Sequence, residues 1–508
     1  MKKRFFPFIV IPFLLFFGLR VGAVENKQEN WQDESIYYLM IDRFNNGDSN
    51  NDFTVKATDS KSYHGGDFKG ITQQLDYIKD MGFTSICLTP IFDNENNGYH
   101  GYWTADFYKI EEHFGSLASF KKLVSEVHKR DMKIIVEFDA NSVGLNHPWL
   151  TDSDKAAWFH EKQEFDGKNS ETAWIDGLPD LAQENSEVQQ YLVDAAKWWV
   201  KETNIDGYKL LRMQNVPEGF WKTLSDNLKK NKSDIFLIGD ADLTNAALVG
   251  KYNKIGVDSV LDYPGNLKLR TAFAKTNESV DEHFSIIKKN KKELASPNLA
   301  VNFMDNSYSE RFTRDSVKNN LHPGTRWKLA LTYMYTIPGI PMVYYGSEIA
   351  LDGGAGNESY QQMDFRTDKE LIDYITKIGE LRNQLPSLTK GSMTPLVSKH
   401  GMTVFKREFD GEVTVIAINN SSKSQTVQIA SDVLDEDKEL RGLLSSDLIK
   451  NKDGQFDIII DRDEAEIYLL SEKSGVNIPY ILAMAAVYSA FVVFLVLVFK
   501  RSKRKQSK

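Results

Sequence analysis

Short apolar runs rich in β-branched and aromatic residues alternate with longer amphipathic stretches along most of this chain. The runs are typical of buried strands, and the stretches between them are typical of helices. Eight strands are expected on this pattern: Ile36 to Ile41, Ser85 to Leu88, Lys133 to Phe138, Gly207 to Leu211, Ile235 to Gly239, Ser259 to Leu261, Leu299 to Met304 and Met342 to Tyr345. Such units predict an α/β fold, a (β/α)8 TIM barrel, with its chemistry at the C-terminal ends of the strands.

Two further regions depart from the barrel pattern. The connection at about 141–185 is long, polar and aromatic, and we expect it to form a small inserted loop domain over the barrel mouth. From about Lys390 onward, apolar and polar residues alternate strictly, which predicts a C-terminal antiparallel β-sandwich domain. The barrel is therefore expected within residues 24–390 and the β domain within residues 391–470.

Both ends of the chain carry apolar segments. Residues 1–23 combine a basic start, an apolar run and small residues at the end, which predicts a secretory signal peptide, with a retained N-terminal anchor as the alternative. Residues 478–499 are apolar and residues 500–508 are basic. This order predicts a transmembrane helix followed by a cytoplasmic tail. We therefore expect a single-pass protein of the cell membrane, with most of the chain extracytoplasmic.

Composition narrows the choice of partners. The 508 residues are 41% hydrophobic and 26% charged, and their formal net charge is -9. An acidic balance gives no support to nucleic acid as a partner. Cys87 is the single cysteine, so an exported chain would be stabilised without disulfides, and Cys87 itself is expected in a buried strand.

Four segments together resemble one enzyme family. They are residues 36–48 (IYYLMIDRFNNGD), 99–103 (YHGYW), 178–181 (LPDL) and 339–346 (GIPMVYYG). The chain resembles the α-amylase family, glycoside hydrolase family 13, from about Ser35 to Leu470, and most nearly its cyclodextrin glucanotransferase and maltogenic amylase branch. The resemblance implies a substrate of α-glucan or maltooligosaccharide and a role in carbohydrate metabolism.

The segment that should carry the catalytic nucleophile is altered. The family pattern is Gly-aromatic-Arg-x-Asp-Ala-x-x-His, and residues 207–215 read GYKLLRMQN. Leu211 therefore stands where a retaining glycosidase needs a carboxylate to form its glycosyl-enzyme intermediate. Lys209 stands at the substrate-binding arginine without its planar fork, and Asn215 replaces the histidine.

The two other catalytic carboxylate positions have also changed. Asp240 stands where the family has its acid glutamate. Its side chain is one methylene shorter, so its carboxyl group is less well placed to act as the acid. Ser307 and Tyr308 replace the His-Asp pair that grips the sugar in the family. Two of the three catalytic carboxylates are thus absent, which predicts a pseudoenzyme. The alternative is slow hydrolysis or transglycosylation through Asp240 and a substitute nucleophile, for which the candidates are Tyr308, Asp139, Asp206 and Glu137.

An oxygen-rich loop near the N-terminus predicts bound Ca²⁺. Carboxylate, amide and carbonyl oxygens are the ligands that Ca²⁺ prefers. The resemblance implies a structural calcium held by Asn46, Asp48, Asn51, Asp52, Gly65 and Asp67. The alternative reading of the same residues is an ordinary Asn/Asp/Gly-rich turn. The family's second calcium would use Asn141, Asp180 and the carbonyl of Asn215.

Sugar-contacting positions remain at the expected mouth. The resemblance implies that Tyr102 stacks on the sugar beside the scissile bond and that His100 bonds its hydroxyls. An aromatic platform with polar neighbours suits a pyranose face, although Tyr102 could equally be retained to pack the barrel rim. We therefore expect a membrane-anchored glucan-binding pseudoenzyme; the remaining alternative is an amylase-like ectodomain that serves as a scaffold for a membrane protein partner.

Overall fold

Eight parallel strands close into a barrel at the centre of the molecule. The computed structural model describes residues 30–241, 246–294, 297–473 and 478–506, so the expected signal peptide lies outside the described residues. The strands are β1 (Ile36–Leu39), β2 (Ser85–Leu88), β5 (Lys133–Asp139), β6 (Gly207–Leu211), β7 (Phe236–Gly239), β8 (Ser259–Val260), β9 (Val301–Phe303) and β10 (Ile340–Tyr344). Their order is β8-β7-β6-β5-β2-β1-β10-β9. A parallel bridge from Leu261 to Val301 joins the two ends, so the expected barrel is confirmed.

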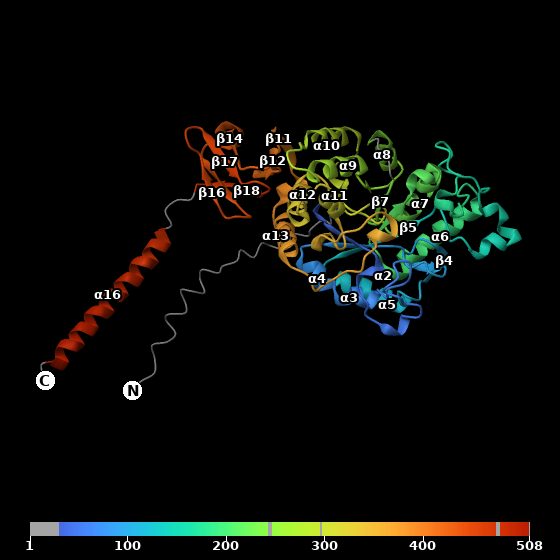
Figure 1. Cartoon of the computed structure of the whole chain (residues 1–508), viewed down its shortest axis with the longest axis horizontal. Helices are drawn as coiled ribbons and strands as arrows, with labels where there is room; N and C mark the ends of the chain where they lie inside the picture. The colour runs from blue at the N-terminus through green and yellow to red at the C-terminus, as the bar shows by residue number, and fades with distance from the viewer. Residues whose placement is uncertain (1–29, 242–245, 295–296, 474–477, 507–508) are drawn as a thin grey trace.

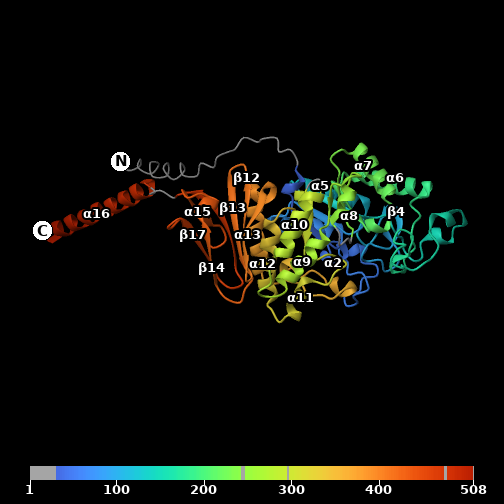
Figure 2. The same ribbon diagram turned by 90° about the horizontal axis from the view of Figure 1, so that it is seen from above.

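Helices surround this barrel on its outer side (Figures 1 and 2). They are α2 (Ile41–Phe44), α3 (Phe68–Gln73), α4 (Leu75–Asp80), α5 (Leu117–His128), α6 (Ser186–Thr203), α7 (Glu218–Asn231), α8 (Ala246–Asn253), α9 (Tyr263–Phe273), α10 (Asp281–Glu293), α11 (Phe312–Lys318), α12 (Pro323–Thr336), α13 (Glu370–Gln384) and α14 (Pro386–Lys390). Helix α5 shows why they form: Ser116 and Ser119 make a reciprocal cap at its start, and Phe120, Leu123 and Val127 bury one face.

Short elements above the strand ends shape the mouth. The hairpin of β3 (Phe92–Asn94) and β4 (Thr104–Ile110) follows β2, and the 3₁₀ turns of the long connection after β5 are η3 (Pro148–Thr151), η4 (Ser153–Trp158) and η5 (Ile175–Gly177). This connection, in teal, lies at the end of the molecule opposite the β domain (Figures 1 and 2). The remaining turns are η1 (Trp31–Asp33), η2 (Ser49–Asn51), η6 (Met213–Asn215), η7 (Pro297–Leu299), η8 (Ser347–Ile349) and η9 (Gly356–Ser359).

The C-terminal residues form the expected β-sheet domain. Its elements are β11 (Ser392–Lys399), β12 (Met402–Phe409), β13 (Glu412–Asn419), β14 (Gln425–Ala430), α15 (Ser431–Leu434), β15 (Lys438–Gly442), β16 (Leu448–Lys450), β17 (Gln455–Ile460) and β18 (Ala465–Glu472). Six strands pair in the order β11-β12-β13-β18-β15-β16, and β14 pairs with β17. Alternate residues such as Val404, Val415 and Ala417 enter a separate apolar core.

A polar contact fixes this domain to the barrel. Asn420, just after β13, accepts a hydrogen bond from Nη1 of the buried Arg326 on α12 at 2.5 Å. Its amide nitrogen donates to the carbonyl oxygens of Ala272, Lys275 and Glu278 at 2.8, 3.1 and 3.3 Å. Arg326 also pairs with Asp463 of the β domain. Asn420 and Arg326 therefore hydrogen-bond to each other, and Asn420 also bonds to backbone carbonyls across the domain boundary.

The expected transmembrane helix is not supported. Helix α16 (Ile478–Gln506) lies apart from both domains in Figure 1. It continues from the apolar residues through Lys500, Arg501 and Lys503. Crossing a bilayer takes about 20 consecutive apolar residues in one helix, and no helix within the described residues is both long and apolar enough to do so. The prediction of a single-pass protein anchored in the cell membrane is therefore wrong.

Candidate functional site

A buried lysine joins two carboxylates at the C-terminal ends of the barrel strands. Lys209 on β6 lies beside Glu137 on β5 in the sheet register, and Asp240 directly follows β7. The Lys209 Nζ lies 2.7 Å from Oε1 of Glu137 and 2.5 Å from Oδ2 of Asp240. All three side chains are almost fully buried. The structure thus brings together the expected acid position and the expected substrate-binding lysine, with Glu137 as their third member.

In this ion cluster, the charge of Lys209 is balanced by the charges of the two carboxylates beside it. Burial lowers the pKa of Lys209, but the charges of Asp240 and Glu137 outweigh burial and hold that pKa above its usual value. Burial raises the pKa of Glu137 against the opposing effect of Lys209. The second oxygen of Asp240, Oδ1, accepts a hydrogen bond from the Tyr263 hydroxyl at 2.7 Å. Both oxygens of Asp240 are therefore engaged as acceptors, which leaves the residue poorly placed to donate a proton to a leaving group.

The expected nucleophile position contributes no chemistry. Leu211 is the last residue of β6, is fully buried and lies beside Asp139 of β5. The residue after it, Arg212, has left-handed backbone angles (φ 51°, ψ 38°), a conformation that costs energy for a side chain of this size. Arg212 Nε lies 3.8 Å from Asp139, and Nη2 lies 3.8 Å from Asp176 in the long connection. A guanidinium thus lies beside the position where the family places its catalytic carboxylate.

Sequence reasoning missed Arg212 and Tyr38. The available signal was the exchange of the family's small residue for a large cation directly after Leu211. Tyr38 and Tyr102 both donate to Oγ of Ser307, at 2.9 and 2.8 Å. Ser307, one of the two residues at the position expected to grip the sugar, therefore hydrogen-bonds to two tyrosines of the protein through its hydroxyl.

The two expected sugar-contacting side chains are largely covered. Tyr102 is 5% exposed and His100 is 8% exposed. The His100 ring stacks on Tyr102, and its Nδ1 accepts a hydrogen bond from the backbone N–H of Tyr102 at 3.0 Å. Burial, aided by the charges of Arg43 and Arg212, lowers the pKa of His100 to about 3, so the ring is neutral. The Tyr308 ring packs on Tyr102 with centroids 5.6 Å apart, while Tyr308 itself stays 38% exposed.

The six residues of the expected calcium site form two adjoining groups. Asn46 donates to both oxygens of Asp52 at 3.0 and 2.9 Å, and Gly65 (φ 90°) lies so close that a Cβ there would meet Asp52 Oδ1 at 2.7 Å. In the second group, the Asp67 Oδ2 accepts from the N–H groups of Gly47 and Asp48 at 3.0 and 2.8 Å. The close approach at Gly65 explains why a glycine is needed there.

Asn51 provides the test of whether these residues suit a cation. Its Oδ1 is buried and has no hydrogen-bonding partner within the part of the chain that the structure describes, while its Nδ2 donates to the carbonyl of His113 at 2.9 Å. A cavity of about 140 Å³ is lined by Asp48, Asn51 and Asp67 together with Lys69 and neighbouring residues. An orphaned amide oxygen beside two carboxylates is a donor set that fits Ca²⁺.

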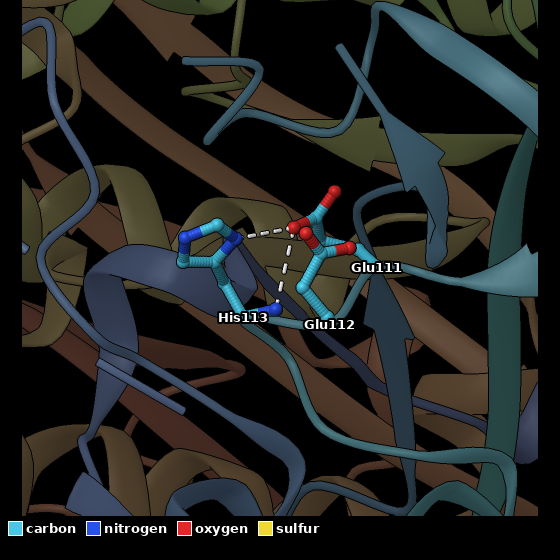
Figure 3. A group of neighbouring side chains, drawn as sticks. All are labelled: Glu111, Glu112 and His113. Carbon is cyan, nitrogen blue, oxygen red and sulfur yellow. Dashed lines mark hydrogen bonds and ion pairs between the residues drawn. The ribbon is translucent and has the colours of Figure 1, made fainter. Parts of the chain in front are cut away.

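A neighbouring acidic cluster has a structural explanation (Figure 3). Glu111, Glu112 and His113 bring their ligand atoms within 4.8 Å of one another. However, Glu111 Oε1 lies 2.5 Å from Nδ1 of His113, and Oε2 accepts from the Asn94 N–H at 2.9 Å. The His113 ring stacks on Tyr63. Glu111 thus ties the β3–β4 hairpin to the loop that carries the expected calcium ligands.

Two residues of the second expected calcium site, Asn141 and Asp180, lie in contact. Asn141 Nδ2 donates to Asp180 at 2.8 Å, and the buried Oδ1 of Asn141 lacks a partner among the described residues. The His160 Nδ1 lies 2.6 Å from the other oxygen of Asp180. Burial raises the pKa of Asp180 to about 7, against the opposing effect of His160. The side-chain amide of Asn215 donates to the carbonyl of Ser170 at 3.0 Å, and the second calcium site stays a prediction.

The fold is a TIM barrel with buried acidic side chains at its strand ends, followed by a C-terminal β domain. Residues 38–386 match the alpha amylase catalytic domain, and residues 391–468 match the alpha-amylase C-terminal domain. The chain therefore belongs to the alpha-amylase family, as its sequence motifs indicated.

Known members of the family show how far the similarity extends. The chain is 31% identical over 479 residues to the Beta/alpha-amylase of Paenibacillus polymyxa, but it spans only 39% of that protein. It is 30% identical to the cyclomaltodextrinase of Thermoanaerobacter pseudethanolicus, over 78% of this chain and 71% of the relative.

Two crystal structures are more similar still. An Anoxybacillus α-amylase matches with 52% identity and a TM-score of 0.87, over 88% of this chain and all of that one. The α-amylase of Geobacillus thermoleovorans, complexed with acarbose, matches with 48% identity and a TM-score of 0.85, over the same shares.

Proposed function

We propose that the chain is an α-glucan-binding member of the alpha-amylase family that does not hydrolyse its ligand. The observation that carries this proposal is the position of Lys209, whose ammonium group lies between Glu137 and Asp240. Retaining hydrolysis needs one carboxylate free to attack and one carboxylic acid free to donate a proton. In this chain Leu211 cannot attack, and Asp240 is bound to a cation on one side and to Tyr263 on the other.

Glucan as the ligand is supported by the relatives and by the composition of the mouth. The Geobacillus thermoleovorans α-amylase, 48% identical, was crystallised with acarbose. This chain keeps Tyr102 and His100 at the barrel mouth, where aromatic and polar side chains suit a sugar. The predicted roles of Asp240, Leu211 and Tyr308 as degenerate catalytic positions belong to the same proposal. We also propose that Asn46, Asp48, Asn51, Asp52, Gly65 and Asp67 hold one structural Ca²⁺.

One observation favours slow catalysis as the second candidate. Because Glu137 and Asp240 both contact the same Lys209 nitrogen, at 2.7 and 2.5 Å, their nearest oxygens can be no more than 5.2 Å apart. Retaining glycosidases place their two carboxyl groups about 5 to 5.5 Å apart. Glu137 is fully buried, however, and Lys209 fills the space between the pair, so a sugar carbon cannot reach Glu137 without displacing the lysine.

The test is calorimetric titration of the purified full-length chain with maltoheptaose in calcium, followed by chromatography of the same sample after a day. Binding without products supports the proposal. Products that disappear in Asp240→Ala would establish the slow enzyme instead. Neither binding nor products would contradict glucan recognition and point to a protein partner for the barrel.

A further inference from the structure

The aromatic face expected to stack on a sugar is already occupied by another ring of the same chain. Tyr308 lies over Tyr102 with ring centroids 5.6 Å apart and planes inclined by 32°. Tyr102 retains only 5% of its surface, whereas Tyr308, the outer ring, is 38% exposed. Proteins also hold a pyranose against an aromatic face, so the space in front of Tyr102 cannot take the Tyr308 ring and a sugar at once.

The backbone that carries Tyr308 is held firmly in place. Asn306 Oδ1 accepts hydrogen bonds from the N–H groups of Tyr308 and Ser309 at 3.0 and 2.9 Å. The Asn306 amide nitrogen donates to the Tyr263 hydroxyl at 3.1 Å, and Tyr263 in turn donates to Asp240. The turn before Tyr308 is therefore tied to the buried ion cluster, which gives the ring a defined position.

Arg212 lies beside the Tyr308 hydroxyl. Burial lowers the pKa of Arg212, but Asp139 and then Tyr308 and Asp176 raise it more, so the guanidinium remains charged beside the Tyr308 hydroxyl. Only 13% of the Arg212 side chain is exposed. Leu211, Arg212 and Tyr308 together replace a carboxylate, a small residue and a second carboxylate of the family pattern with three bulkier side chains.

We propose that Tyr308 is a built-in plug that closes the sugar position facing Tyr102. This inference concerns the cleft of the proposed function and rests on glucan being its ligand. A maltooligosaccharide then binds the wild-type chain only through glucose units on either side of the plug, because the central unit would have to displace the Tyr308 ring. Removal of the ring opens the Tyr102 face and adds a stacking contact. The plug determines which part of the cleft a glucan can use.

The experiment compares three full-length proteins by calorimetric titration with maltoheptaose. Tyr308→Ala removes the ring, and Tyr308→Phe keeps the ring without its hydroxyl as the matched control. We expect Tyr308→Ala to bind at least tenfold more tightly than the wild type and Tyr308→Phe to bind like the wild type. Tyr308→Ser is a second ring-free variant, to be used if Tyr308→Ala does not show a cooperative thermal transition.

The outcomes separate this inference from the proposed function. If the wild type does not bind but Tyr308→Ala does, the plug is established and wild-type glucan binding is not. If the wild type binds and the ring-free variants bind equally or more weakly, glucan binding stands and the plug is refuted. Absence of binding in the wild type and in both ring-free variants overturns both proposals, because an opened Tyr102 face would then hold no sugar.

Discussion

The ammonium group of Lys209 lies 2.5 Å from Oδ2 of Asp240, and neither side chain is more than a few per cent exposed. Asp240 holds the position at which the family resemblance predicts the acid, and in this chain it belongs to a buried ion cluster. The cluster's contribution to stability can therefore be measured without any assay of activity.

Lys209→Met should strongly destabilise the fold. It leaves Glu137 and Asp240 buried without their cation, and breaking a buried pair in this way costs about 3–5 kcal/mol. Urea denaturation measures the change in the free energy of unfolding. The control is Lys222→Met, because Lys222 pairs with Asp226 at 2.7 Å on an exposed helix surface and should contribute less than about 1 kcal/mol.

A compensated variant sharpens this prediction. Glu137→Gln and Asp240→Asn added to Lys209→Met remove the uncompensated charges, so most of the lost stability should return. A triple variant as unstable as the single one would show that Lys209 acts through packing rather than through its charge.

Calcium removal should lower the thermal stability. A cation bound at 100 times its dissociation constant adds about 2.7 kcal/mol to the free energy of unfolding. EDTA should therefore lower the Tm by several degrees in scanning calorimetry. Asn51→Ala should abolish most of this shift, because it removes the buried oxygen that has no partner among the described residues. Asn96→Ala, in an exposed turn, should keep the full shift; equal behaviour of the two variants would argue against the site.

Asp93→Asn should stabilise the chain in a pH-dependent way. Asp93 lies directly across from Asp106 in the β3–β4 hairpin, and like charges in this position repel. Burial, with the charges of Glu111 and Glu112, raises the pKa of Asp93 from 3.8 to about 6. The folded chain thus binds this proton more tightly than the unfolded chain, and its stability falls as the pH rises from about 4 to about 6.

The variant removes this penalty. Because Asp93 is only half-buried, solvent screening reduces the expected gain to about 1 kcal/mol at pH 8, with little gain at pH 4. Urea titrations at both values measure it, with the exposed Asp234→Asn as the control. A gain of the same size at pH 4 and pH 8 would exclude the electrostatic explanation.

Asn420→Ala should weaken the joint between the barrel and the β domain. The change removes the acceptor for Arg326 and the donor to three barrel carbonyls. Groups left buried without partners cost about 1–3 kcal/mol each, so a loss of about 2–4 kcal/mol is expected. Thr426→Ala, at an exposed position of β14 in the same domain, is the control. If both variants unfold alike in calorimetry, the contact does not couple the domains.

Much of the barrel could be predicted from the sequence because parallel strands buried on both faces read as continuous apolar runs. β2 and β6 begin and end at the expected residues. The C-terminal helix shows the limit of composition. Residues 478–499 are apolar, and the helix continues into the basic residues that follow. No helix within the described residues is long and apolar enough to cross a membrane.

The sequence proposed residues for the candidate site but carried no information on their contacts. Motif spacing located Lys209, Asp240 and Tyr308, because each lies at a fixed distance from a glycine or an asparagine of the family pattern. Spacing does not indicate that Lys209 turns toward Glu137 or that Tyr308 lies on Tyr102. Both contacts join residues from different segments of the barrel. The family pattern has other residues at positions 209 and 308, so it gives no indication of these contacts.

The barrel is closed between β8 and β9 by fewer residue pairs than join its other neighbouring strands. β8 has two residues, and beyond it a single bridge from Leu261 to Val301 completes the ring. Few hydrogen bonds must break to separate β8 from β9. The amide hydrogens of Leu261 and Asp262 should therefore exchange with solvent sooner than those of β5 or β6. Asp240 directly follows β7, the strand that pairs with β8. Transient local opening there would let water reach the buried ion cluster while the rest of the barrel stays intact.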